Sequence, residues 1–440
     1  MTGPASALPA DPDSAARVDA GLLPSLRGLD RNGRLLFLTR VLRMFAYGFL
    51  AVVLVLYLAG LGLDALWIGA ILTLTLVGDT LVSLWLTTHA DRIGRRRVLV
   101  AGSLLMTAAG VVFAVTSWVP LLILAATVGV ISPTGNEVGP FLAVEQAALS
   151  QATPDARRTP TFAWYNLAGY LATAVGALSA GFLSQALLAM GLVAVDAYRV
   201  IVIGYAIVGL LMAAVFWRVG AAVEVPPAEL AADDGIARRL GLGARSRGIV
   251  ARLSLLFSLD AFGGGFIPQS LMAYWFHLQY GVEPALLGGI FFGANLLAAV
   301  SSLSASRFAA RFGLINTMVF THLPSNILLI LVPLMPNLAL AIAVLLLRFR
   351  LSQMDVPTRQ SYVMAVVEPG ERSAAAGVTG IARTTGAAIS PVLSAPLVAS
   401  ASLAAVPFFL AGGLKIAYDL LLYRAFRSGT APDERAERGG

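Results

Sequence analysis

Ala90-Asp-Arg-Ile-Gly-Arg-Arg-Arg-Val98 is the stretch that decides the fold of this chain. It places four arginines and one aspartate between two apolar runs, 66–88 and 98–117. Apolar runs of about 20 residues cross the hydrocarbon core of a bilayer as helices. A short charged segment between two such runs is a loop at the membrane surface, and its arginines favour the cytoplasmic side.

The composition of the whole chain indicates the same class. Of its 440 residues, 58% are hydrophobic and 12% are charged, whereas about 25% are charged in a soluble domain. The net charge of +7 does not indicate nucleic-acid binding here, because the arginines gather in short loops between apolar runs. The chain has no cysteine, and its histidines (His89, His277 and His322) are scattered. We therefore expect a lipid environment, no nucleic-acid partner, no metal and no cofactor.

Apolar runs of bilayer length recur along the chain and predict about twelve helices. They cover 35–60, 66–88, 98–117, 120–147, 161–185 and 198–218, and then 250–278, 285–305, 315–335, 337–365, 372–399 and 402–424. Arginines occupy alternate loops, so that 92–97, 157–158, 307–311 and 372 are basic while 61–65, 117–120 and 279–284 hold none. This alternation predicts an all-α integral membrane protein with both termini in the cytoplasm.

The longest connection, 219–249, divides the predicted helices six and six. It separates an N-terminal bundle, 35–218, from a C-terminal bundle, 250–425, and we expect it to be a cytoplasmic linker. Residues 1–34 are predicted to be a disordered cytoplasmic segment without the apolar core of a signal peptide, and 426–440 a cytoplasmic tail.

The two halves echo each other. Three matching pairs stand at a nearly constant separation: Gly94 and Gly313 (219 residues apart), Glu137 and Asp355 (218), and Pro154 and Pro369 (215). Three echoes in the same order indicate two six-helix pseudo-repeats. Parallel repeats with a binding site at the midplane between them are an architecture of transporters.

The stretch 87–99 resembles the signature loop of the major facilitator superfamily, G-x-L-x-D-R-x-G-R-[RK]-x-x-[LV]. It matches at Asp91, Arg92, Gly94, Arg95, Arg96 and Leu99, and it departs at Thr87 and His89. The resemblance implies the twelve-helix fold of that superfamily and rocker-switch alternating access. It also implies a cytoplasmic gate at Asp91, Arg92, Gly94 and Arg95. The G-P-x-x-G-G motif of drug/proton antiporters is absent from helix five, 166–181, so the subfamily stays open.

Charged side chains inside apolar helices cost about 3 kcal/mol or more each at the bilayer centre, so each requires a role. Glu137 follows Pro133 and Gly135, which predict a break in its helix, and its repeat partner Asp355 precedes Pro357. With Asp260, these carboxyl groups are candidates for proton coupling, since a buried carboxyl group can bind and release a proton near neutral pH. The alternative is that Glu137 and Asp355 anchor the broken helices by hydrogen bonds.

Six further side chains are candidates for substrate binding: Arg43, Asn166, Gln269, Arg348, Arg350 and Arg383. A guanidinium keeps its proton and binds carboxylates or phosphates bidentately, so the arginines favour an anionic or zwitterionic small molecule. Arg348 and Arg350 are two residues apart on a helix and lie on different faces, so at most one of them points into a central cavity.

Two charged positions leave alternatives open. Arg43 stands 217 residues before Asp260, so that the two could face each other across the cavity; alternatively Arg43 snorkels to the cytoplasmic surface. Lys415 and Asp419 are four residues apart on the last helix, and we expect them to pair with each other.

These observations lead to one expected function. We expect a monomeric secondary active transporter of a small molecule in the cell inner (plasma) membrane, coupled to protons and directed outward. Uptake or uniport of an organic anion on the same fold is one alternative, and a transport-inactive receptor is another. The chain has no G-x-x-x-x-G-K-[ST] loop and no nucleophile–base pattern, so neither an ATP-driven pump nor an enzyme is expected.

Overall fold

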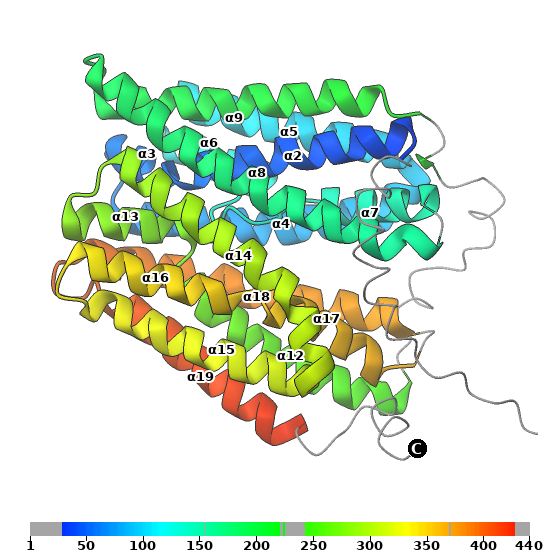
Figure 1. Ribbon diagram of the computed structural model, residues 1–440. Helices are drawn as coiled ribbons and strands as arrows, with labels where there is room; N and C mark the ends of the chain where they lie inside the picture. The colour runs from blue at the N-terminus through cyan, green and yellow to red at the C-terminus, as the bar shows by residue number, and fades with distance from the viewer. Residues whose placement is uncertain (1–28, 154, 221–222, 225–242, 369–370, 427–440) are drawn as a thin grey trace, which may run out of the picture.

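The computed structural model describes residues 29–153, 155–220, 223–224, 243–368 and 371–426. Long helices run roughly side by side along one common direction (Figure 1), and the described residues contain helices and loops but no strand. Residues 1–28 of the predicted N-terminal segment, most of the predicted linker and residues 427–440 of the predicted tail fall outside the described residues, while residues 31–34, predicted to be disordered, belong to the first described helix.

The helices form two groups in chain order. The N-terminal half holds α2 (Arg31–Ala51), α3 (Leu54–Gly60), α4 (Ala65–Ile93), α5 (Arg95–Val115), α6 (Val119–Val128), α7 (Phe141–Ala152), α8 (Asp155–Ala189) and α9 (Ala194–Trp217). The C-terminal half holds α12 (Ala244–Gly265), α13 (Gln269–Tyr280), α14 (Pro284–Phe312), α15 (Leu314–Leu331), the 3₁₀ turn Val332–Leu334, α16 (Leu338–Ser352), α17 (Asp355–Val366), α18 (Arg372–Ala399) and α19 (Val406–Phe426).

The predicted fold class is confirmed. Among the described residues, 8 helical spans are long and apolar enough to cross a membrane, and the bent pair α2–α3 makes a ninth. The pairs α6–α7 and α16–α17 supply two more crossings that are each interrupted, and α18 supplies one that is rich in small and hydroxyl residues. The chain is thus an all-α, multi-pass membrane protein with about twelve crossings, six in each half.

Four of the predicted apolar runs are divided in the structure. α2 and α3 meet at a bend of 44°, and the corresponding helices of the second half, α12 and α13, are separated at Phe266–Pro268. Residues 129–140 separate α6 from α7, and two residues, 353–354, separate α16 from α17. Glycine or proline lies at or near three of these breaks and weakens or removes the bonds of a helix interior; the bend at Val52–Val53 has neither residue. The same helices break in both halves, which supports the duplication.

Gly94 and Gly313 are the clearest structural echo between the halves. Each is the single residue between two helices, α4 and α5 or α14 and α15, and each has a positive φ, +104° and +81°. Residues with a side chain avoid this backbone region. The signature glycine is therefore needed for the geometry of the turn.

We expect Gly94→Ala to lower the free energy of unfolding by about 1–3 kcal/mol, because it forces a side-chain residue to a positive φ. Steric contact adds little to this loss, since the nearest neighbour of a new Cβ at position 94 is the Glu224 carboxylate at 3.5 Å. The matched control is Gly380→Ala on α18, where the new methyl group meets nothing within 4 Å. Unfolding of both variants in mixed micelles checks this, and equal stability of the two would contradict the role of Gly94.

The halves meet along α4–α18 and α8–α14. We call the end that carries Arg92–Arg97 the basic end (right in Figure 1) and the other the far end. Toward the far end, Gly181 and Gly288 bring α8 and α14 so close that a Cβ on Gly181 would lie 2.4 Å from the Pro284 carbonyl oxygen. The Val392 amide donates to Thr73 Oγ1 across the seam at 3.1 Å. The molecule is therefore in a state that is sealed toward the far end.

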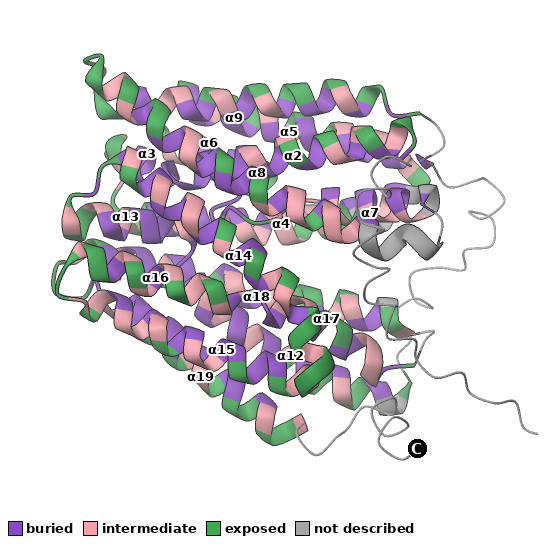
Figure 2. Ribbon diagram, in the orientation of Figure 1, coloured by how far each residue is buried: buried purple, intermediate pink, exposed green. Residues whose placement is uncertain are grey.

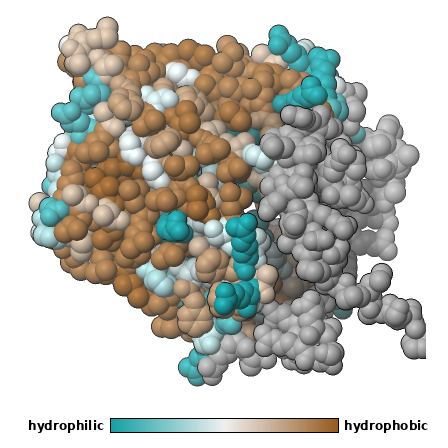
Figure 3. Space-filling view, in the orientation of Figure 1, coloured by the Kyte–Doolittle hydropathy of each residue, from teal (hydrophilic) through white to brown (hydrophobic). Residues whose placement is uncertain are grey.

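The outer surface suits a lipid environment. Exposed residues lie on the outward faces and at the ends of the helices, while the buried ones face neighbouring helices (Figure 2). Large apolar side chains cover most of the face seen in Figure 3, and hydrophilic residues gather mainly toward its ends. This apolar belt is the surface that lipid tails would cover.

Candidate functional site

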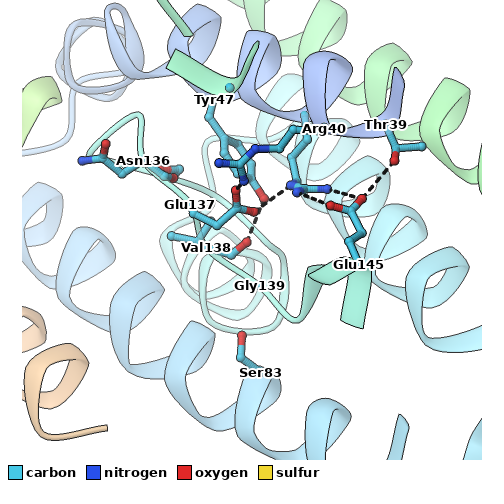
Figure 4. A network of polar contacts seen from close by, with 12 residues as sticks. Thr39, Arg40, Tyr47, Ser83, Asn136, Glu137, Val138, Gly139 and Glu145 are labelled. Carbon is cyan, nitrogen blue, oxygen red and sulfur yellow. Dashed lines mark hydrogen bonds and ion pairs between the residues drawn. The ribbon is translucent and has the colours of Figure 1, made fainter. Parts of the chain in front are cut away.

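A buried ion network fills the interior of the N-terminal half (Figure 4). The Arg43 side chain is 0% exposed and donates from Nη1 and Nη2 to the two carboxylate oxygens of Glu145, at 2.8 and 2.7 Å. Its Nε donates to Glu137 at 2.7 Å, and Arg40 forms an ion pair with the same carboxylate. Two arginines of α2 thus hold two glutamates of the interrupted helix α6–α7.

Neutral groups complete this network. Thr39 Oγ1 donates to Glu145 at 2.9 Å, and the buried Tyr165 hydroxyl of α8 donates to the same carboxylate. The Arg43 guanidinium lies over the Phe141 ring, 4.8 Å from its centre. A buried ion pair is stable only when hydrogen bonds satisfy its remaining polar atoms, and these contacts meet that need. The two positive and two negative charges of the network balance.

The non-helical segment 129–140 carries Glu137 through the membrane interior, and its backbone groups bond to side chains of neighbouring helices. The Tyr47 hydroxyl donates to the Val138 carbonyl at 3.1 Å, and the Gly139 amide donates to Asp79 Oδ1 at 2.5 Å. Across the seam, the Ser270 amide donates to the Pro133 carbonyl at 3.1 Å. Irregular backbone at membrane depth persists only where protein or a cavity surrounds it, and here the neighbouring helices enclose the segment.

A second ion network fills the C-terminal half. Asp260 of α12 is 3% exposed and accepts from Lys415 Nζ at 2.6 Å and from Arg359 Nη1 at 3.4 Å. The same Arg359 atom donates to Asp355 at 2.9 Å. The expectation that Lys415 pairs with Asp419 is wrong, because the tertiary fold brings Asp260 within reach of Lys415.

His322 extends this network between α15 and α19. Its Nδ1 lies 2.9 Å from Asp419 Oδ1, and its Nε2 lies 3.8 Å from Asp260 Oδ1. The Asn326 amide donates to the other Asp419 oxygen at 2.9 Å. The network thus joins three aspartates, one lysine, one arginine and one histidine from four helices.

The networks occupy equivalent helices with the signs of charge exchanged. In the first half the arginine comes from α2 and its carboxylate from α7; in the second half the carboxylate comes from α12 and the arginine from α17. The partners of Arg43 all lie in the N-terminal half, and those of Asp260 in the C-terminal half. Arg43 therefore neither pairs with Asp260 across a cavity nor snorkels to the surface. Each half therefore has an ion network whose partners all lie within that half.

The other predicted binding residues lie apart from these ion pairs. Gln269 is half-buried at the start of α13, where its Oε1 accepts from Asn295 at 3.4 Å and its Nε2 has no partner among the described residues. Asn166 and Arg350 are exposed, and Arg383 is half-buried. Arg348 is half-buried over the Phe349 ring, and its buried Nε also has no partner in the described part. The structure thus leaves Gln269 and Arg348 with unsatisfied donors in the interior.

The signature loop contacts residues 223–224 of the predicted linker. Glu224 accepts from the backbone amides of Arg95 and Arg96, at 2.6 and 3.1 Å, and so caps the first turn of α5. Arg95 is buried and donates to the Val223 carbonyl at 3.2 Å, whereas Arg92 is exposed. The Asp91 side chain lies outside the described part of the structure, so its predicted gate contact stays a prediction.

The second half has a matching carboxylate at the basic end. Glu371 accepts from the Gly243 amide at 2.6 Å, just before α12 begins. A hydrogen bond from Ser246 and this amide bond favour the charged form, and they hold the pKa of Glu371 below its usual value. In each half, therefore, a carboxylate near the basic end binds the first turn of a helix.

Sequence reasoning missed five residues that the networks require: Arg40, Asp79, Glu145, His322 as a network member, and Arg359. Each stands inside an apolar run of bilayer length, which is itself a signal of function. Arg359 and Asp355 are also four residues apart, the spacing of a helical ion pair. Their other partners, however, include residues between 60 and 102 positions away in the chain.

A cavity of about 600 Å³ opens at the far end between the halves. Its lining includes Tyr198 and Gln185 of the N-terminal half and Tyr274, His277 and Glu283 of the C-terminal half. None of the predicted gate, coupling or binding residues lines it. The cavity lies at the far end beside the close approach of α8 and α14, and it is separate from the ion networks.

Comparison with known proteins extends these findings to a family. The sequence model of the Major Facilitator Superfamily matches residues 36–391. The uncharacterized membrane protein YJR124C of Saccharomyces cerevisiae is 30% identical over 418 residues, which cover 89% of this chain and 93% of the yeast protein.

Solved structures share the fold at low identity. The nucleoside transporter NupG superposes with a TM-score of 0.67 at 14% identity, over 90% of this chain and 99% of NupG. The xylose transporter XylE of E. coli gives 0.67 at 14% identity, over 90% and 98% of the two chains. The human organic anion transporter MFSD10 gives 0.58 at 17% identity, over 91% and 99%. The signature loop, the duplicated six-helix halves and the match over most of the sequence lead to one conclusion: the chain belongs to the Major Facilitator Superfamily, whose members are membrane transporters and not enzymes.

Proposed function

We propose that this protein is a proton-coupled secondary transporter that exports a small molecule by rocker-switch alternating access. One observation carries the proposal: each half holds buried carboxylates beside an interrupted helix, Glu137 and Glu145 in one, Asp260 and Asp355 in the other. Ionisable groups at membrane depth mark ion and substrate pathways. The seal at the far end supports a cycle in which the halves close alternately at the two ends.

The free polar groups support an anionic or zwitterionic substrate. Arg348 and Gln269 have donors that lack partners among the described residues, and Arg383 adds a guanidinium on α18. A carboxylate or phosphate would satisfy such donors. Arg43 already has two glutamate partners, so we place it in the N-terminal network rather than against the substrate. Among proteins of this fold, MFSD10 is an organic anion transporter by name, which agrees with this substrate class.

We place the protein as a monomer in the cell inner (plasma) membrane, with the basic end in the cytoplasm. The arginines of the alternate loops support this orientation through the positive-inside rule. The signature loop with Asp91, Arg92, Gly94 and Arg95 would then form the cytoplasmic gate, and the sealed state would be the one closed to the outside.

Transport by purified protein in proteoliposomes tests the proposal. With a panel of labelled organic anions and zwitterions, we expect an imposed pH gradient to drive accumulation, and its direction to distinguish export from uptake. Glu137→Gln and Asp355→Asn should each abolish gradient-driven accumulation, since each removes a titratable group. The control is Asp196→Asn, which removes a surface carboxylate whose side chain is 46% exposed. Full gradient-driven transport by both core variants would rule out their role in coupling.

A further inference from the structure

The C-terminal network contains a group that the N-terminal network lacks. The N-terminal network consists of two guanidinium and two carboxylate groups in direct contact, with equal positive and negative charge. In the C-terminal network, three carboxylates contact two permanently cationic side chains, Arg359 and Lys415, and the imidazole of His322. The direct contacts of this network balance only when His322 carries a proton.

The geometry around the imidazole favours the protonated ring. A neutral imidazole has one N–H donor and one lone pair, whereas an imidazolium has two donors. Nδ1 of His322 faces Asp419 at 2.9 Å, and Nε2 faces Asp260 at 3.8 Å, so both ring nitrogens point toward carboxylate oxygens. The Asn326 amide nitrogen lies 3.1 Å from Nδ1 but also donates to Asp419 at 2.9 Å. In the neutral ring the lone pair of one ring nitrogen faces a carboxylate, whereas in the protonated ring both carboxylate contacts are attractive.

The neighbours of His322 are charged on every side. Asp260 approaches from α12, Asp355 and Arg359 lie on α17, Lys415, Tyr418 and Asp419 come from α19, and Asn326 is on the same helix, α15; Arg348 of α16 acts on Asp260 and Asp355. Lys415 opposes a positive charge on the ring, but Lys415 is itself held by Asp260 at 2.6 Å. The ring contacts the carboxylates of Asp419 at 2.9 Å and of Asp260 at 3.8 Å, and both contacts favour the charged ring.

We propose that His322 is the proton-binding site of this transporter; this rests on the proton coupling proposed above and assigns it to a residue. In the sealed state, the imidazolium bridges Asp419 of α19 and Asp260 of α12. When Nε2 releases its proton to water, its contact with Asp260 becomes repulsive, and α12 loses its ion pair with α15. Because α12 continues into α13, which packs against α3 at the far end, proton release weakens the seal.

The protonation itself can be followed without knowing the substrate. The chain has only three histidines, so His89→Gln with His277→Gln leaves His322 as the single imidazole. In protein labelled with ¹⁵N-histidine, we expect the ring nitrogens to change between the imidazolium and neutral patterns within about pH 5–9. A ring that stays neutral over this whole range would overturn the proposal, and so would one that stays charged.

The link to the seal is tested by distance measurement. The chain has no cysteine, so spin labels can be placed at the far end through Val193→Cys in the N-terminal half and Leu403→Cys in the C-terminal half, both of them exposed positions. We expect the distance between the labels to be short at low pH and to lengthen at high pH. His322→Gln should remove this pH response, and His277→Gln, which changes a histidine at the far end, should keep it.

The outcomes separate the two proposals. If the pH response of the distance persists in His322→Gln, proton coupling stands and the assignment to His322 falls. If the unmodified network shows no pH response and no pH-driven transport, the proposed coupling falls, and the assignment falls with it. The NMR titration stays informative even if His322→Gln does not fold, since it leaves this residue unchanged.

Discussion

Arg43→Met is expected to lower the free energy of unfolding by about 3–5 kcal/mol, the largest effect of any single substitution considered for this protein. The change leaves Glu145 with 0% of its side chain exposed and without its bidentate cation. An unpaired buried charge is far more costly than a buried ion pair, because nothing offsets its loss of hydration. Only the weaker donors Thr39 and Tyr165 remain to stabilise the carboxylate.

The double variant Arg43→Met with Glu145→Gln tests the reason for this loss. It removes both charges and keeps a side chain that can bond to Thr39, so we expect it to recover most of the stability. Arg350→Met is the matched control, because Arg350 is an exposed arginine on α16. Unfolding in detergent–SDS mixtures gives the free energy of unfolding of the unmodified protein and of the three variants. Equal losses for Arg43→Met and Arg350→Met, or no recovery in the double variant, would show that the ion pair does not govern stability.

Gly288→Leu is expected to open the far end of the transporter without unfolding either half. A Cβ at Gly288 would lie 2.7 Å from the Ala177 carbonyl oxygen and 2.9 Å from the Gly181 Cα, both across the seam. Overpacking of this kind costs about 1–3 kcal/mol. The cost falls only on the sealed state, so the ratio of the two states should change by about 5- to 150-fold, and transport that requires sealing should fall accordingly.

Gly289→Leu is the matched control for this substitution. It adds the same side chain one residue along α14, at a position where a Cβ meets nothing within 4 Å. Spin labels at Val193→Cys and Leu403→Cys should report longer distances in Gly288→Leu and unchanged distances in Gly289→Leu. If neither variant changes the distance, or both do so equally, α8 and α14 are not held by this close approach.

Much of the fold follows from local sequence. Apolar length predicts the crossings, the arginines of alternate loops predict which ends lie together, and the spacing of Gly94 and Gly313 predicts the duplication. Pro133 and Gly135 also predict the break beside Glu137, because the reason for a break lies within a few residues of it. The predictions fail where a partner is distant. Lys415 was expected to pair with Asp419 on its own helix, yet it binds Asp260 on α12.

By itself, therefore, the sequence determined the class of protein, the six-and-six division and the set of charged residues that must have a role in the membrane. Each of these depends on a property of one segment, its length, hydropathy or charge. Only the tertiary structure decided that Arg43 is locked to Glu145, that the signs of charge are exchanged between the halves, and that His322 lies between two aspartates. The physical reason is that a buried charge is stabilised by whichever opposite charge the packing of helices brings to it, and that packing pairs charged residues separated by as many as 155 positions.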